Sequence, residues 1–262
     1  MECRLDLLEF DVAGTAGWYS SIVGVLAGFA LLAILIPLDH EAARDDERSA
    51  DTVVIMTCAF FSLLLLSFSY AILAGRVGDT ERGQAVHEQL LLGVAVGLSS
   101  LLLMFALNTL LATYGANRRA FLPARRIIVV ATSLIGPAVV IAVQFSNALD
   151  IERVRIGSDP TVACGLGGLP NGVWINLAIT TAGLIAVVVT ALLRRRIPRN
   201  SRAASRIAVA VLLYTTLVVV WTSIGAPLLP PEVLTNAVFE HVALAITALA
   251  AVGVAITSWS GR

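Results

Sequence analysis

The sequence predicts an all-α integral membrane protein, a bundle of seven transmembrane helices with the N-terminus outside and the C-terminus in the cytoplasm. Hydrophobic residues make up 58% of the 262 residues and charged residues only 14%, whereas soluble domains average about 45–50% and about 25%. Seven long apolar runs divide the chain, and its arginines alternate between the gaps that separate them. These observations place the whole chain, residues 1–262, in one polytopic membrane domain.

Each apolar run is long enough to cross a bilayer, because about 20 helical residues span a hydrocarbon core of roughly 30 Å. The gaps between the runs are short and leave no room for a soluble domain. The predicted spans are residues 18–38, 52–74, 88–113, 127–149, 173–193, 207–224 and 236–259.

The first three spans have recognisable ends. The first begins at the interfacial aromatic Trp18 and is closed by Pro37, which cannot continue a helix. The second follows an acidic segment that ends at Asp51 and runs without a charge to Ala74. The third begins at Glu88 and leads into a basic gap.

The last four spans follow the same rule. Pro137 lies at the middle of the fourth span, where it removes a backbone donor and predicts a kink. The fifth leads into the most basic gap of the chain, and the sixth is followed by a gap without arginine. The seventh ends at Trp259, an amphipathic side chain expected at headgroup level.

The arginines determine the predicted orientation. The chain contains no lysine, so all eighteen basic side chains are arginine. The N-terminal segment and the second, fourth and sixth gaps hold five: Arg4, Arg76, Arg82, Arg153 and Arg155. The other gaps and the C-terminus hold thirteen: Arg44, Arg48, Arg118, Arg119, Arg125, Arg126, Arg194, Arg195, Arg196, Arg199, Arg202, Arg206 and Arg262. Short cytoplasmic loops are enriched in basic residues, so the second group is predicted on the cytoplasmic side. The predicted membrane is the plasma membrane.

Aromatic and small residues mark the ends and the packing faces of the helices. Predicted headgroup anchors are Trp18, Tyr19, Tyr70, Trp174 and Trp221 outside and Tyr114 and Trp259 inside. GxxxG steps, which allow close approach of helix backbones in lipid, occur at Gly24 and Gly28 and at Gly93 and Gly97. They predict packing within the chain or, alternatively, contact with a second copy or another membrane subunit.

Polar residues inside the spans gather at the predicted outer ends. An ionisable residue at mid-bilayer costs about 2.5–3.5 kcal/mol on insertion scales and usually faces a partner or a wet cavity. We therefore predict that Glu88, Asp150, Glu240 and His241 share one outward-facing polar pocket, with His87 as a weaker member. The alternative is that these residues are interfacial, each solvated at its own helix end.

No motif assigns a cofactor or a metal. His87, Glu88, Glu240 and His241 are residue types that bind zinc, but no HExxH or CxxC spacing supports such a site. Seven helices of this length match the architecture of microbial rhodopsins, yet a retinal Schiff base requires a lysine and the chain has none. Retinal chemistry is excluded.

The predicted partners are lipids. Arginines near an anionic leaflet contribute on the order of 1 kcal/mol each, so the segment Arg194–Arg206 is expected to hold anionic headgroups. Nucleic acid is not a predicted partner, because this run lacks interleaved aromatic residues. Cys3 and Cys164 are both predicted outside, where a disulfide between them is an open alternative, and Cys58 is expected to behave as an apolar residue in the second span.

Three classes of function remain open. The first is binding or transport of a small solute or ion through the outward polar pocket, which we prefer because the chain has almost no extramembrane mass. The second is a membrane-embedded enzyme with an acid/base or metal site at the outer interface. The third is an accessory or scaffold subunit. Convergence of the outward polar residues in the folded chain favours the first two classes.

Overall fold

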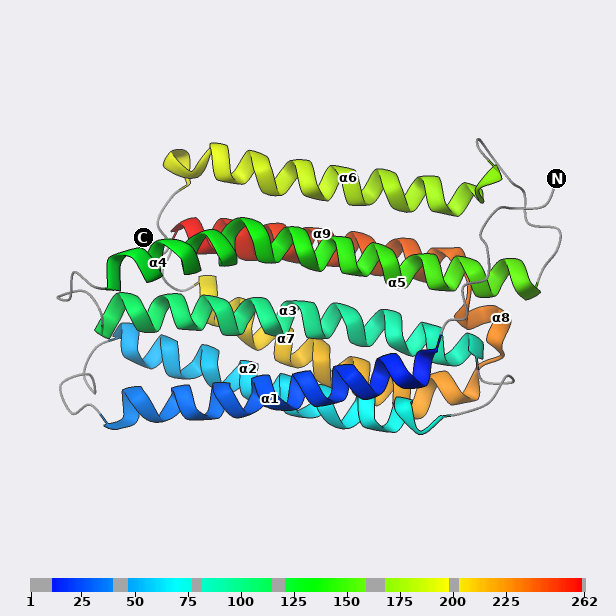
Figure 1. Cartoon of the computed structure of the whole chain (residues 1–262), viewed down its shortest axis with the longest axis horizontal. Coiled ribbons are helices and arrows are strands. Elements are labelled where there is room, and N and C mark those ends of the chain that lie inside the picture. Colours follow the sequence, from blue (N-terminus) through cyan, green and yellow to red (C-terminus); the bar gives the residue numbers. More distant parts are fainter. Residues whose placement is uncertain are drawn as a thin grey trace.

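The computed structural model describes residues 11–39, 47–76, 82–114, 121–158, 168–197 and 203–260, and within these ranges the chain is almost entirely helical (Figure 1). The longer helices are α1 (Val12–Asp39), α2 (Glu47–Ala74), α3 (Arg82–Tyr114), α4 (Phe121–Val130), α5 (Gly136–Ser158), α6 (Asn171–Leu192), α7 (Ala203–Val220) and α9 (Ala237–Ser260). Short turns complete the order: η3 (Ala131–Ile135), η5 (Arg194–Arg196), η6 (Trp221–Gly225), η7 (Ala226–Leu228) and α8 (Pro231–Leu234).

Within the described residues, seven helical segments are long and apolar enough to cross a membrane, which is the predicted number of spans. The largest differences from prediction lie at the end of the bundle where α1 and α3 begin. The third span begins at Arg82 rather than near Glu88, and the fourth continues to Gly157. Arg153 and Arg155, expected in a gap, therefore lie on α5.

The helices run side by side along the long axis of the molecule (Figure 1). Helix α3 lies at the centre and packs against α2, α5, α7 and α9, while α1 packs chiefly on α2 and α6 chiefly on α9 and α5. The main hydrophobic core is built largely from α1, α2, α3 and α7. A smaller core around Ile141, Val187 and Ala251 joins α5, α6 and α9.

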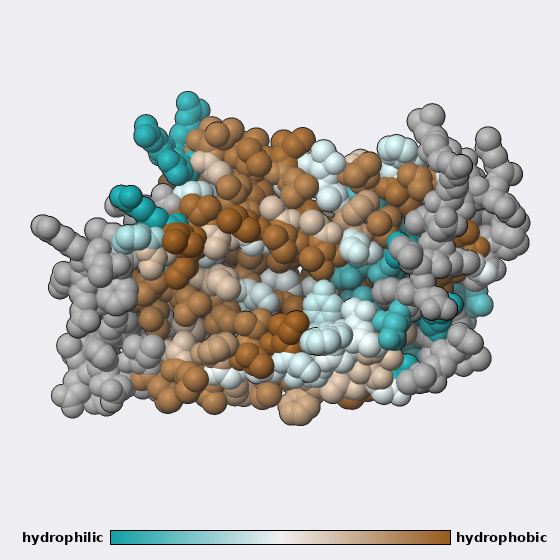
Figure 2. Space-filling model, viewed as in Figure 1, coloured by the Kyte–Doolittle hydropathy of each residue, from teal (hydrophilic) through white to brown (hydrophobic). Residues whose placement is uncertain are grey.

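Apolar side chains also cover the outside of the bundle, as contact with lipid requires. Leu217 is 67% exposed and Leu249 is 74% exposed, although both belong to helices that cross the apolar part of the molecule. Figure 2 shows this hydrophobic band between more polar ends. The chain is consistent with a polytopic membrane protein whose outer helix faces contact the acyl chains.

The kink predicted at Pro137 takes the form of a π-helical turn. Residues Ala131–Ile135 form η3, and the N–H of Gly136 donates to the carbonyl of Ala131, five residues earlier. A proline ring presses against the carbonyl four residues before it, so a wider turn ahead of Pro137 relieves this contact. A second π turn, η6, precedes Pro227 in the same way.

The predicted small-residue faces pack within the chain. A Cβ on Gly97 would come within 2.6 Å of Val140 Cγ1, and one on Gly93 would overlap Asn147 Nδ2, so α5 covers this step. A Cβ on Gly24 would lie 3.1 Å from Ser67 Oγ on α2, whereas one on Gly28 would meet nothing within 4 Å. Contact of a second copy through Gly24 and Gly28 stays a prediction.

Two of the predicted aromatic anchors have another role. Trp18 is 74% exposed and Trp174 is 41% exposed, as anchors should be, but Tyr70 is only 1% exposed. The Tyr70 ring stacks on Tyr19 with centroids 5.2 Å apart and links α1 to α2. Trp259 is also buried, with the Arg194 guanidinium 5.4 Å from the centre of its ring. These two buried rings join neighbouring segments of the fold.

Candidate functional site

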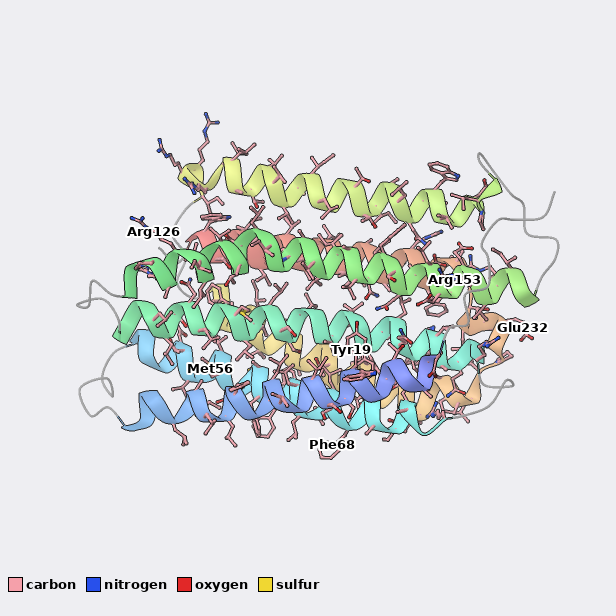
Figure 3. All side chains as sticks on the ribbon, viewed as in Figure 1. Tyr19, Met56, Phe68, Arg126, Arg153 and Glu232 are labelled. Carbon is pink, nitrogen blue, oxygen red and sulfur yellow. The ribbon has the colours of Figure 1, made fainter. Side chains whose placement is uncertain are left out.

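Buried charged and polar side chains gather at one end of the bundle, where α1, α3, α6 and α9 begin (Figure 1, right). The buried ones are His87, Glu88, Gln89, Gln144, Asn147, Asp150, Glu152, Asn176 and Glu240. Figure 3 shows Arg153 and Glu232 at this end and Arg126 at the other. The polar residues that the sequence analysis singled out thus lie at a common end of the fold.

Arg155 is the centre of the largest polar network at this end. Its Nη2 lies 2.6 Å from Glu240 Oε2 on α9, and its Nη1 lies 2.8 Å from Glu152 Oε1 on α5. Its Nε donates to the carbonyl oxygen of Thr235 at 2.9 Å. Charge-assisted bonds of this kind are short and about twice as strong as neutral ones. A single guanidinium therefore joins two buried carboxylates and the start of α9.

Asn176 on α6 extends the network to His241. Its Nδ2 donates to Glu240 Oε1, and its Oδ1 lies 2.8 Å from His241 Nδ1. A carboxylate can only accept hydrogen bonds, so the amide nitrogen must face Glu240 and the amide oxygen must face His241. It follows that His241 Nδ1 carries a proton and donates to Asn176. We call Glu152, Arg155, Asn176, Glu240 and His241 the Arg155 cluster.

Local sequence explains how two of the three helices, α5 and α9, place these groups. Glu152 and Arg155 are three residues apart on α5, a spacing that puts both side chains on one helix face. Asn236 caps α9, because its Oδ1 accepts the N–H of Val238 at 2.9 Å. Glu240 then lies in the first turn of α9, where the helix dipole favours a negative charge.

Glu152 has an unusual position. It is 0% exposed, and its Oε2 has no hydrogen-bond partner within the described part of the chain. Its carboxylate presses against the first turn of α6, because a Cβ added to Gly172 would overlap Glu152 Oε1. An unpaired buried polar group costs about 1–3 kcal/mol, and more when charged. One oxygen of the cluster is thus buried and unsatisfied.

The charges of the Arg155 cluster do not balance. Glu152 and Glu240 contribute two negative charges when both are ionised, and Arg155 contributes one positive charge. The helix termini beside the two carboxylates compensate in part, by about 0.3–1 kcal/mol each at exposed sites and up to about 2 kcal/mol where partly buried. Burying an uncompensated charge costs several kcal/mol. The site therefore favours the gain of one positive charge.

His87 adjoins the cluster through the backbone. Its Nδ1 lies 2.9 Å from the carbonyl oxygen of Leu234, the residue before the Thr235 that Arg155 contacts. Trp221 Nε1 donates to His87 Nε2 at 3.2 Å, so Nε2 is an acceptor and the ring proton is on Nδ1. Gly225 permits this position of Trp221, since a Cβ there would come within 2.5 Å of the indole ring.

Glu88 and Asp150 form ion pairs of their own. Glu88 Oε1 pairs with Arg76 Nη1 and accepts a bond of 2.8 Å from Gln84 Nε2. Asp150 Oδ1 pairs with Arg153 Nη1 at 2.6 Å. Of the five residues predicted to share a pocket, Glu240 and His241 therefore meet at Asn176, and His87 adjoins them. Glu88 and Asp150 instead form ion pairs with Arg76 and Arg153.

Glu152, Arg155 and Asn176 are not among the residues predicted for the site. The predicted fourth span ends at Leu149, which leaves Glu152 and Arg155 in the connecting loop. The acid and base three residues apart were the available signal, because this spacing stabilises a continuing helix. Asn176 offered only its depth on the fifth span, which many structural asparagines share.

Neither a metal site nor a disulfide is found in the described ranges. They contain no group of three or more His, Cys, Asp or Glu side chains that could hold a metal ion. Cys58 is buried and unbonded. Cys3 and Cys164, whose bridge was left open, lie outside the described residues, as does most of the segment between Arg196 and Arg206.

Comparison with known proteins gives no further assignment. No protein-family model, curated protein or solved structure matches the chain.

Proposed function

We propose that this polytopic membrane protein binds a small cation at the Arg155 cluster and carries it across the membrane. The main support is a buried network of two carboxylates and one guanidinium, in which one carboxylate oxygen has no hydrogen-bond partner among the described residues. Intramembrane ionisable residues commonly mark ion and proton pathways. Three different helices build the cluster, so relative movement of α5, α6 and α9 would alter the site directly.

His87, Glu88 and Asp150 have a supporting role in this proposal. The hydrogen bond of His87 to Leu234 holds the segment whose next residue, Thr235, contacts Arg155. The ion pairs of Glu88 with Arg76 and of Asp150 with Arg153 neutralise these two buried carboxylates. Among the buried charged groups of the described residues at this end, the excess negative charge then lies in the Arg155 cluster.

The proposed orientation places this cluster at the outer face of the plasma membrane. Arg194, Arg195 and Arg196 are exposed at the opposite end, and Figure 2 shows a polar patch at that end. In this orientation the three arginines face the cytoplasmic leaflet, where each contributes on the order of 1 kcal/mol of attraction to anionic lipid.

Thiol labelling tests the orientation. In a variant whose native cysteines are replaced by alanine, a single cysteine at Glu232 is expected to react with a membrane-impermeant maleimide in intact cells. A single cysteine at Arg195 is expected to react only after the membrane is permeabilised. Both positions are exposed, and they lie at opposite ends of the bundle, Glu232 on α8 and Arg195 on η5, which follows the end of α6. The reverse labelling pattern would show that the cluster faces the cytoplasm.

Glu240→Gln tests the function. We expect a small cation to raise the thermal stability of the purified protein. The cations to be tested are Na⁺, K⁺ and methylammonium, and the proton is tested by lowering the pH. Glu240→Gln should lower the apparent affinity for this cation, measured from the thermal stabilisation, at least tenfold. The reason is that the substitution removes one buried charge and keeps the shape of the side chain. Proteoliposome flux of the same cation should fall in parallel.

Glu232→Gln is the matched control, because Glu232 is an exposed carboxylate at the same end of the bundle. It should leave both readouts unchanged. If no cation stabilises the wild-type protein or crosses the vesicle membrane, the binding proposal is wrong. The scaffold interpretation then takes its place, since a scaffold needs the network only for helix packing.

A further inference from the structure

We infer that the cation is the proton and that Glu152 carries it on Oε2. This inference rests on the proposed function and names its substrate. It starts from a difference among the carboxylate oxygens of the Arg155 cluster. Glu240 Oε1 and Oε2 and Glu152 Oε1 each accept a hydrogen bond, whereas Glu152 Oε2 accepts none within the described residues. The free acceptor is therefore confined to a single atom.

Charged and titratable groups approach Glu152 from two of the helices around it. Arg155 lies on its own helix, α5, and binds Oε1. On α9, Glu240 shares Arg155 with Glu152, and His241 joins the same cluster through Asn176. Helix α6 contributes the Gly172 backbone in this contact. With Arg155 already shared between both carboxylates, one added proton makes the sum of the three charged groups zero.

The geometry favours a proton over a metal ion. A calcium ion takes 6–8 oxygen ligands and magnesium requires octahedral coordination, whereas a proton needs one oxygen. The free atom here is one carboxylate oxygen, held against the first turn of α6 where even the Cβ of an alanine would overlap the same carboxylate. Within the described chain no third acidic, histidine or cysteine side chain completes a metal-ligand group.

The proposed binding step is a simple protonation of the Glu152 carboxylate. One proton from the aqueous phase forms an O–H bond at Glu152 Oε2, and the carboxylate becomes a neutral carboxylic acid. Arg155 keeps its own proton, and its Nη1 continues to donate to Oε1, which is now the carbonyl oxygen. No other covalent bond changes, and release is the reverse step. His241, which adjoins Glu240 along α9, is partly exposed.

Infrared difference spectroscopy tests this step directly. Lowering the pH of reconstituted wild-type protein should produce the C=O stretch of a buried carboxylic acid, with the small downshift in D₂O that identifies an exchangeable proton. Glu152→Gln should abolish this band, and Glu152→Asp should retain it at a shifted frequency. Glu232→Gln should leave it unchanged. A band that survives in Glu152→Gln, or no band in the wild type, would overturn the assignment to Glu152.

Vesicle measurements separate this inference from the proposed function. An imposed pH gradient across proteoliposomes that enclose a pH-sensitive dye should collapse at least tenfold faster with wild-type protein than with Glu152→Gln, while Glu232→Gln should behave as the wild type. Stabilisation and flux by Na⁺, K⁺ or methylammonium without proton uptake would refute the proton and leave cation transport standing. Absence of both activities would refute the proposed function as well. Should Glu152→Gln fail to fold, the Glu152→Asp band shift and its flux decide the assignment.

Discussion

Arg155→Ala is expected to lower the free energy of unfolding by about 3–5 kcal/mol, the range found when one partner of a buried ion pair is removed. Among the described residues, Arg155 is the ion-pair partner of both Glu152 and Glu240, and both carboxylates are 0% exposed. Its removal leaves two buried negative charges near each other, at the junction of α5 and α9. Thermal unfolding of the purified protein in detergent measures the loss.

The double variant Arg155→Ala/Glu240→Gln distinguishes electrostatics from packing. Neutralising Glu240 removes one of the uncompensated charges, so the double variant should be more stable than Arg155→Ala alone. Arg195→Ala is the control, because Arg195 is exposed on η5 at the opposite end and surface substitutions usually change stability by within about 0.5 kcal/mol. A loss below about 1 kcal/mol for Arg155→Ala would mean that the cluster is already open to water.

Gly172→Ala is expected to destabilise the protein by about 1–3 kcal/mol and to impair proton uptake. The new Cβ would overlap Glu152 Oε1, so the carboxylate must move and its bond of 2.8 Å to Arg155 Nη1 must lengthen or break. Overpacking of this kind typically costs about 1–3 kcal/mol. The effect acts through Glu152, because an alanine is otherwise well tolerated in a helix. Thermal unfolding and the vesicle dye assay measure the two consequences.

Two further variants test this explanation. Gly157→Ala is the matched control, since Gly157 lies near the same end on α5 and a Cβ there would meet nothing within 4 Å. It should be neutral or slightly stabilising, because alanine loses less backbone entropy than glycine. In the Glu152→Ala background the overlapping carboxylate is gone, so Gly172→Ala should then have little effect. An equal loss in both backgrounds would show that Gly172 acts through helix α6 alone.

The position of Trp221 shows why some of the site could not be read from the chain. An aromatic residue near a predicted helix end indicates a headgroup anchor on average. Here a π turn ahead of Pro227 and the absence of a side chain at Gly225 turn the indole toward His87 on α3. The π turn follows from local chemistry, but its partner 134 residues away does not.

Glu240 and His241 could be predicted from the sequence, because the free-energy cost of placing an ionisable side chain at that depth of the membrane is a property of the single residue. Glu152 and Arg155 could not be selected in the same way. A run with two arginines beside acidic residues is equally compatible with a solvated loop. Only the approach of Glu240 from α9 and Asn176 from α6 makes the burial of Glu152 and Arg155 favourable. Helix α5 therefore ends at Ser158 and not at the predicted Leu149, and tertiary contacts account for the difference.

The sequence by itself determined the seven helical spans, because a chain in hydrocarbon must satisfy its backbone donors and acceptors within each segment, and apolar length is therefore sufficient to predict a span. The tertiary structure decided which polar side chains form one network. Pairing between helices depends on their neighbours, rotation and depth, none of which is contained in a single segment. Gly172 illustrates this difference: in the sequence it is one of twenty glycines, and in the fold it is the surface against which the Glu152 carboxylate packs.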